Sequence, residues 1–180
     1  MSDDLVQLSR NVITTGSKSF AMAARLFDFE TRASAYLLYA WCRHCDDVID
    51  GQEFGFSGPE PDTAPHDPKA ELRRLYALTN DALDGKPMAD PTFRAFQRVA
   101  LRHAIPRQHA LALLEGFAMD VDRRRFVTLD DTLRYCYHVA GVVGVMMSGI
   151  MGARDEATLD RASDLGIAFQ LTNIARDIVD

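Results

Sequence analysis

The sequence predicts an all-α protein, and three observations support that prediction. Apolar residues recur every three or four positions along most of the 180 residues, which is the spacing of one helix face. Glycines and prolines fall mainly between these stretches. No segment shows the strict alternation of a half-buried strand or the Asn-Gly turn of a hairpin. We therefore expect helices connected by turns and loops.

The expected helices follow one another along nearly the whole chain. In the clearest one, Trp41 and Cys45 belong to a 3–4 apolar spacing, Asp28 or Thr31 is a suitable N-cap, and Gly51 is a suitable stop. Proline at positions 91 and 106 suits a first helical turn. The segment 51–68 holds four of the seven prolines and is expected to be a loop. The expected helices cover residues 3–14, 20–27, 31–49, 69–83, 91–104, 106–124, 129–151 and 156–179.

Composition excludes several classes of protein. The 20 basic and 26 acidic residues give a net charge of −6, which makes the chain a poor general binder of nucleic acid. Three cysteines are too few for a disulfide framework and indicate a reducing, cytoplasmic compartment. The first residues lack the pattern of a signal peptide. The longest apolar stretch, residues 139–152, is shorter than the roughly 20 residues of a membrane span, so lipid contact would be peripheral.

A first candidate site lies at the end of the helix expected over 31–49. Asp46 and Asp50 are one turn apart on one helix face, with Arg43 and Tyr39 one and two turns below them, whereas Asp47 is expected to face elsewhere. Like charges at this spacing repel, and acids near a helix C-terminus oppose the macrodipole. A hard divalent cation would relieve this repulsion. From these residues alone, a surface acidic cluster remains the alternative.

A second candidate site lies in the last expected helix. Gln170, Asn173 and Asp177 share one stripe, which Arg176 and Asp180 flank. Amide and carboxylate oxygens beside apolar packing indicate oxygen ligands for a metal, and a surface Arg176–Asp180 ion pair is the alternative. If the two stripes faced each other in a bundle, they would hold metal ions with positions left open for a phosphorylated ligand.

Two basic groups and one short segment could serve the phosphate oxygens of such a ligand. Arg43 and Arg176 would donate charge-assisted hydrogen bonds. The Gly-Ser-Lys-Ser segment at 16–19 comes just before a short helix, whose N-terminus favours anions. The segment is not a Walker P-loop, because the preceding glycine and strand are absent.

Five motifs together resemble the bacterial phytoene synthases of the squalene/phytoene synthase family, and the resemblance extends over all 180 residues. The first is Ser-Lys-Ser-Phe at 17–20, and the second is Leu-Tyr-Ala-Trp-Cys-Arg-His-Cys-Asp-Asp-Val-Ile-Asp at 38–50. Leu-Glu-Gly-Phe-Ala-Met-Asp at 114–120 and Leu-Arg-Tyr-Cys-Tyr-His-Val-Ala-Gly-Val-Val-Gly at 133–144 follow. The last is Gln-Leu-Thr-Asn-Ile-Ala-Arg-Asp-Ile-Val-Asp at 170–180.

The resemblance implies a class I isoprenoid synthase, an all-α bundle of helices around a central cavity. It implies one domain over 1–180 that stops inside the second aspartate-rich motif, with that motif's last aspartate at position 181 and the C-terminal helices missing. It further implies metal ligands from the two aspartate-rich motifs, at 38–50 and 170–180. Diphosphate contacts are implied from these two motifs and from the Ser-Lys-Ser segment at 17–19. The implied metal ligands are Asp46, Asp50, Asn173 and Asp177, of which Asp46, Asp50 and Asp177 are also taken as catalytic. The implied substrate-binding residues are Ser17, Lys18, Ser19, Tyr39, Arg43, Gln170, Asn173 and Arg176.

The resemblance also implies a reaction: head-to-head condensation of two geranylgeranyl diphosphates to phytoene through a cyclopropyl diphosphate, with release of pyrophosphate. The implied cofactor is Mg²⁺, with Mn²⁺ as a substitute, and no NADPH is expected. Such hydrophobic substrates imply peripheral membrane contact, while the oligomeric state is left open. A squalene or dehydrosqualene synthase of the same family remains an alternative. So does a helical fragment without catalytic activity.

Two features have a structural and a functional interpretation. Cys42 and Cys45 match the spacing of a redox or zinc half-site, but Cys45 falls on the apolar side of its helix and favours core packing. The small residues of 139–151 indicate tight helix packing by composition. The family resemblance suggests instead that part of this face lines a prenyl tunnel.

Overall fold

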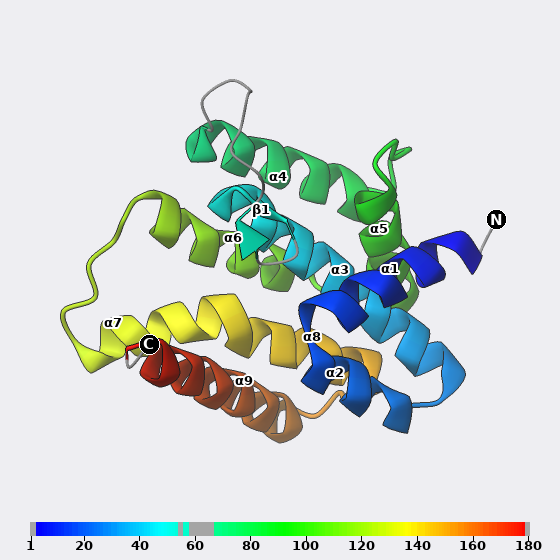
Figure 1. The fold of residues 1–180 in the computed structure, drawn as a ribbon. Helices are drawn as coiled ribbons and strands as arrows, with labels where there is room; N and C mark the ends of the chain where they lie inside the picture. Colours follow the sequence, from blue (N-terminus) through cyan, green and yellow to red (C-terminus); the bar gives the residue numbers. More distant parts are fainter. Residues whose placement is uncertain (1–2, 54–55, 58–66, 179–180) are drawn as a thin grey trace. The chain divides into compact units, whose positions relative to one another are not determined.

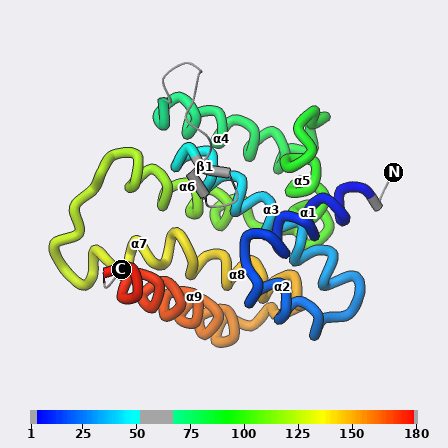
Figure 2. Tube along the Cα trace, viewed as in Figure 1, coloured from blue at the N-terminus to red at the C-terminus, as the bar shows by residue number. Residues whose placement is uncertain are grey.

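The computed structural model describes residues 3–53, 56–57 and 67–178, and the all-α class is confirmed. The chain divides into two compact units, Met1–Ala104 and Ile105–Asp180. Figure 1 shows the helices of each unit in sequence colours, and Figure 2 traces the same path as a tube. No helix in the described ranges has the length and apolar character needed to cross a membrane.

The described residues of unit 1 form five α-helices, one 3₁₀ turn and a short β-pair. The pair joins Gln52 to Ser57 and Glu53 to Phe56 in antiparallel register, inside the segment where a loop without strands was expected. The elements are α1 (Asp3–Gly16), α2 (Lys18–Ala23), η1 (Ala24–Leu26), α3 (Phe29–Asp50), β1 (Gln52–Glu53), β2 (Phe56–Ser57), α4 (Pro68–Leu83) and α5 (Pro91–His103).

The helix α3 is the centre of unit 1, where it packs against α1, α4 and α5. Its boundaries are local in origin. The Asp28 carboxylate accepts the backbone N–H groups of Glu30 and Thr31, and Gly51 ends the helix in the left-handed region at φ 63°. In the core, Trp41 is fully buried and stacks on Phe96 of α5 with 4.0 Å between ring centroids. This packing fixes the part of α3 that comes just before the acidic motif.

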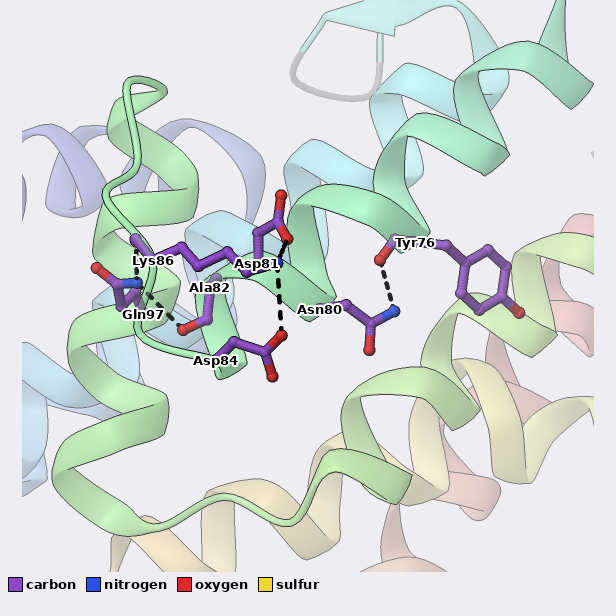
Figure 3. A network of polar contacts seen from close by, with 7 residues as sticks. All are labelled: Tyr76, Asn80, Asp81, Ala82, Asp84, Lys86 and Gln97. Atoms are coloured by element: carbon purple, nitrogen blue, oxygen red, sulfur yellow. Dashed lines mark hydrogen bonds and ion pairs between the residues drawn. The ribbon is translucent and has the colours of Figure 1, made fainter.

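The turn between α4 and α5 is held by side chains (Figure 3). Lys86 Nζ lies 2.5 Å from the Asp81 carboxylate and 3.6 Å from that of Asp84. Gln97 on α5 donates from Nε2 to the carbonyls of Ala82, at 3.2 Å, and Lys86, at 2.8 Å. The amide of Gln97 therefore satisfies two backbone acceptors of the turn.

Unit 2 holds the remaining helices. The expected helix over 129–151 is interrupted by a π-helical segment, so it is divided into three consecutive elements. The expected helix over 106–124 is shorter than predicted, because Pro106 is the N-cap and Arg123 adopts a left-handed φ of 49°. The elements are α6 (Arg107–Val121), α7 (Leu129–Cys136), the π segment η2 (Tyr137–Gly141), α8 (Val142–Ile150) and α9 (Glu156–Asp177).

The core of unit 2 lies where α6 and α8 pack together. Leu113, Leu114 and Phe117 on α6 are buried, as are Val142 and Met146 on α8. The helix α9 is different, because Gly166 is its only buried residue among those described. It is therefore attached to η2 and α8 through close backbone contact more than through buried side chains.

Candidate functional site

The acidic motif at the end of α3 forms an ion-pair cluster around Arg43. Arg43 Nη1 lies 3.1 Å from Asp46 Oδ2, and Nη2 lies 2.8 Å from Asp47 Oδ1. Asp47 is the more buried partner, with 13% of its side chain exposed against 39% for Asp46. Asp50 is exposed on the last turn of the same helix. Asp46 and Asp50 therefore remain accessible to solvent, while Asp47 is largely covered.

Asp47 belongs to this cluster although its helix position alone does not assign it to the site. It was expected to face away from the Asp46–Asp50 stripe, yet it makes the shorter of the two Arg43 contacts. The signal that could have found it is the i,i+4 spacing of Arg43 and Asp47, the standard spacing of a helical ion pair. Its position makes it a second anchor that orients the Arg43 guanidinium.

The Ser17–Ser19 segment and Tyr39 lie close together within unit 1. A Cβ on Gly16 would lie 2.6 Å from the Tyr39 hydroxyl, so only glycine allows the tyrosine to approach α1 this closely. Phe20 packs edge-on against Tyr39, with ring centroids 6.2 Å apart. The Ser17 hydroxyl caps α2 by accepting the Phe20 N–H at 3.3 Å, whereas Lys18 and Ser19 are exposed.

Burial is the main influence on the hydroxyl of Tyr39. Loss of water raises its pKa, the Arg43 charge opposes that rise, and the Asp47 charge adds to it. Tyr39 therefore stays a neutral hydroxyl, able to donate a hydrogen bond, at physiological pH. The pKa of the half-buried Cys42 rises to about 12, chiefly through burial of its thiol, and the nearby Asp46 charge contributes.

The ligand atoms on α3 are of the type that a hard divalent cation binds, but there are too few of them for a complete site. Asp46 and Asp50 offer solvent-accessible carboxylate oxygens, the ligand type that Mg²⁺ prefers. Arg43 Nε is buried and has no hydrogen-bond partner among the described residues, a donor that a ligand oxygen would satisfy. Over residues 3–53, 56–57 and 67–178, no three His, Cys, Asp or Glu side chains gather as a metal site. The α3 residues thus make up at most part of a ligand set.

The second motif lies on the last turns of α9, in unit 2. Asn173 Nδ2 donates to Gln170 Oε1 at 3.4 Å, and Arg176 Nε donates to Asp177 Oδ1 at 2.8 Å. Asn173, Arg176 and Asp177 are exposed, while Gln170 is half-buried. The expected Arg176–Asp180 contact involves a residue outside the described ranges. The paired Asp177 side chain is still 62% exposed, and a solvent-accessible carboxylate suits a metal ligand.

Small residues bring α9 against its neighbours in unit 2. A Cβ on Gly144 of α8 would clash with the Ala162 carbonyl oxygen, and one on Gly166 would lie 2.5 Å from the Ala140 carbonyl oxygen. Both obstacles are backbone atoms, so the glycines are required for this approach. The tight-packing interpretation of the small residues in 139–151 is therefore confirmed at these contacts. The positions of Asn173 and Asp177 depend on the close approach of Gly166, because the two residues lie two and three turns beyond it on the same helix.

Two further expectations concern residues beside these motifs. Cys45 is buried, and burial raises its pKa, so the core-packing interpretation holds and the thiolate needed for metal or redox chemistry is disfavoured. In unit 2, the Tyr135 hydroxyl donates to Asp120 Oδ2 at 3.2 Å. Asp120, the last residue of the 114–120 motif, is exposed and hydrogen-bonded.

The residues predicted from the two motifs thus form one cluster in unit 1 and one on α9 in unit 2. In the first, Arg43 pairs with Asp46 and Asp47, and the charges of these groups act on Tyr39. Phe20 links Tyr39 to the Ser17 cap. Their roles as metal ligands and diphosphate contacts remain predictions.

Comparison with known proteins places the chain in a family. The family model for squalene/phytoene synthase matches residues 13–180. A phytoene synthase of Pseudescherichia vulneris is 58% identical over 176 residues, which cover 98% of this chain and 56% of that protein. A 15-cis-phytoene synthase of Pantoea ananas is 60% identical over 168 residues, covering 93% of this chain and 54% of that protein. The chain therefore spans about half the length of these curated relatives.

Solved structures agree in fold. A dehydrosqualene synthase crystal structure in complex with ligand is 31% identical, with a TM-score of 0.80 over 97% of this chain and 56% of that one. The squalene synthase HpnC of Alicyclobacillus acidocaldarius is 24% identical, with a TM-score of 0.78 over 98% of this chain and 64% of that one, and shows the fold alone. With a family model that matches nearly the whole chain, the protein belongs to the squalene/phytoene synthase family.

Proposed function

We propose that the whole protein is a prenyltransferase that joins two geranylgeranyl diphosphates head to head to give phytoene, a step of carotenoid biosynthesis. The observation that carries this proposal is the 56–60% identity to bacterial proteins named phytoene synthase and 15-cis-phytoene synthase. One diphosphate leaves as the cyclopropyl diphosphate forms. The second leaves in a later ionisation, and rearrangement with proton loss then gives the hydrocarbon.

The residues of the two clusters are assigned roles that match their chemistry. Asp46 and Asp50 on α3, and Asn173 and Asp177 on α9, supply the oxygen ligands for Mg²⁺, with Mn²⁺ as a substitute. When bound, the metal stabilises the negative charge that develops on a departing diphosphate. Asp47 is a positioning residue, because it reaches the reaction only through Arg43.

The remaining polar groups are assigned to the diphosphates. Arg43 and Arg176 donate charge-assisted hydrogen bonds to phosphate oxygens. The Tyr39 hydroxyl, kept neutral by burial, is a donor in the same cluster. The further diphosphate contacts are Ser17, Lys18, Ser19, Gln170 and Asn173. We further propose that residues 1–180 are the first part of a single isoprenoid-synthase domain, with the last aspartate of the second motif beyond them.

The carbocation formed when a diphosphate leaves must be kept away from water. The hydrophobic substrate must reach the protein from a lipid phase. We therefore propose peripheral membrane contact, and the three cysteines support a reducing, cytoplasmic location. No nucleotide cofactor is included in the proposal, since the named product needs no reduction. A squalene synthase reaction would require NADPH, so the presence of that reductant separates the two activities.

Product analysis tests the proposed reaction. The whole enzyme, incubated with geranylgeranyl diphosphate and Mg²⁺, is expected to release pyrophosphate and form a forty-carbon hydrocarbon with the mass and absorption of phytoene. NADPH should change neither the rate nor the mass of the product. A product two hydrogens heavier that forms only with NADPH, or exclusive use of farnesyl diphosphate, would replace this proposal with the squalene-type reaction.

Substitution of one acid from each cluster tests the site. Asp46→Asn and Asp177→Asn should each reduce kcat by two orders of magnitude or more while the fold is retained, because a ligand oxygen that stabilises the leaving group is lost. The matched control is Asp164→Asn, an exposed acid on α9 outside both clusters. Full activity in either cluster variant would refute the assignment of that acid.

The 180-residue chain offers a test that does not need turnover. Mg²⁺ together with an unreactive diphosphate analogue should raise its melting temperature, because a ligand that binds only the folded state stabilises it. Asp46→Asn should abolish the rise, and Asp164→Asn should retain it. An unchanged melting temperature would favour the alternative of a helical fragment that binds nothing.

A further inference from the structure

A pocket with a basic lining opens in unit 1 between α1, α2 with η1, and the first turns of α3. Its volume is about 530 Å³. Arg10 of α1, Arg25 of η1 and Arg32 of α3 line it, together with uncharged residues, and no acidic side chain does. Positive charge is therefore concentrated at one place on a chain whose net charge is −6.

The arginines of this pocket have no carboxylate partner in the part of the chain that the structure describes. Within the described residues, no ion pair is found for Arg10, Arg25 or Arg32, whereas Arg43 and Arg102 of the same unit are both paired with acids. Like charges that line one pocket repel, and no acidic side chain among the described residues lines the pocket beside them. Such a pocket favours an anionic partner.

Three large apolar side chains lie exposed beside these arginines. Met22 on α2 is 68% exposed, Leu26 on η1 is 88% exposed, and Phe29 at the start of α3 is 70% exposed. Phe29 lines the pocket itself, and Met22 lines an adjoining one that shares Arg25. A single exposed apolar residue is ordinary, but three next to unpaired cations form a mixed basic and apolar surface.

The combination of arginines and exposed apolar side chains favours an anionic lipid surface over a soluble anion. A soluble anion would use the arginines but would leave the apolar side chains in water. An anionic lipid surface uses both, because apolar side chains enter the boundary of the acyl chains while arginine side chains reach the phosphates. The acidic character of the rest of the chain would orient the docking, since other faces are repelled by anionic headgroups.

We propose that this docking surface, defined as Arg10, Met22, Arg25, Leu26, Phe29 and Arg32, attaches the protein to membranes containing anionic phospholipid. The proposal deepens the membrane contact proposed above. It does not depend on the catalytic assignment, because none of these six residues belongs to the metal or diphosphate clusters.

Co-sedimentation with vesicles tests the docking surface. The enzyme should bind vesicles of phosphatidylcholine mixed with phosphatidylglycerol more tightly than vesicles of phosphatidylcholine alone, and added salt should weaken the binding. Arg25→Gln and Arg32→Gln should each lower the partition coefficient by about fivefold, the effect of one basic residue at an anionic surface. Arg73→Gln, an exposed arginine on α4 outside the pocket, is the charge control and should bind as the unchanged protein does.

A second pair of variants tests the apolar part. Leu26→Ser should weaken binding to the mixed vesicles, whereas Leu101→Ser, at a 55% exposed leucine of α5, should not. Circular dichroism of each variant checks that the fold is retained. Turnover of detergent-dispersed substrate should be unchanged in Arg25→Gln, so a failure of docking and a failure of the proposed catalysis give different results.

Three results would overturn the proposal. One is equal binding to both kinds of vesicle by all variants. Another is displacement from vesicles by soluble glycerol phosphate with no effect of Leu26→Ser, which would identify the pocket as a site for a free anion. The third is binding by the 180-residue chain but not by the whole enzyme, which would mean that the surface is covered there.

Discussion

The contact of Gly166 with the π segment η2 should control both the stability of unit 2 and the position of the second motif. A methyl group at Gly166 would lie 2.5 Å from the Ala140 carbonyl oxygen and 2.9 Å from the Gly141 Cα, where ordinary contact begins at 3.4 Å. The helix would have to move by about 1 Å, because backbone atoms cannot rotate away as a side chain does. Gly166→Ala is therefore the most informative single substitution in α9.

The magnitude follows from two opposed effects. Alanine in a helix interior gains about 0.5–1 kcal/mol over glycine through the unfolded chain. Overpacking against a rigid neighbour costs about 1–3 kcal/mol, and more where backbone must shift. We therefore expect Gly166→Ala to lower the free energy of unfolding by about 1–2 kcal/mol. At about 2–4 °C for each kcal/mol, the melting temperature falls by several degrees.

Urea denaturation of matched variants measures this effect. Gly149→Ala is the control, because it makes the same change in helix α8 of the same unit and its Cβ meets nothing within 4 Å. That variant should be as stable as the unchanged protein or up to about 1 kcal/mol more stable. In the whole enzyme, Gly166→Ala should also reduce activity, since Asn173 and Asp177 move with the helix. Equal stability of the two variants would refute the argument from close packing.

Three other predictions concern the rest of the molecule. Gln97→Ala should lower the free energy of unfolding by about 1 kcal/mol in urea, because the Lys86 carbonyl loses its side-chain donor while the Ala82 carbonyl keeps the Gly85 N–H; no change would show that water replaces the amide. His44 has a pKa below its usual 6.5, chiefly through burial, so its neutral form stabilises the fold fully above pH 6.5 and less as the pH falls below that value. Between pH 7 and pH 5, the free energy of unfolding of His44→Gln should therefore fall less than that of the unchanged protein. Parallel plots of unfolding free energy against pH for the two proteins would contradict this. Cys42, with a pKa of about 12, and Cys45 should react with a thiol reagent at pH 8 far more slowly than in the urea-unfolded chain, and equal rates would contradict the burial of both thiols.

The sequence alone determined the all-α class, most of the helices and the motifs, because these depend on residues close together in the chain. Asp28 and Gly51 mark the ends of α3 by capping and by a left-handed turn, and these are interactions within a few residues. The spacing of Asp46 and Asp50 on one helix face is equally local. The order of the five motifs indicated the family, which the comparison confirmed.

Only the tertiary structure decided the features that depend on contacts between helices or on the choice among local conformations. The spacing of Arg43 allowed a contact with Asp46 or Asp47, and the packed helix showed that the guanidinium spans both. The approach of Tyr39 to Gly16, and of α9 to η2 at Gly166, joins residues distant in the chain, and no local pattern encodes it. The π segment within 129–151 likewise could not be predicted from a 3.6-residue period, because no Gly–Pro break or polar cap separates it from the α-helices on either side. Helical periodicity is a local property, whereas close packing depends on shape between elements, and this difference divides what was predictable from what was not.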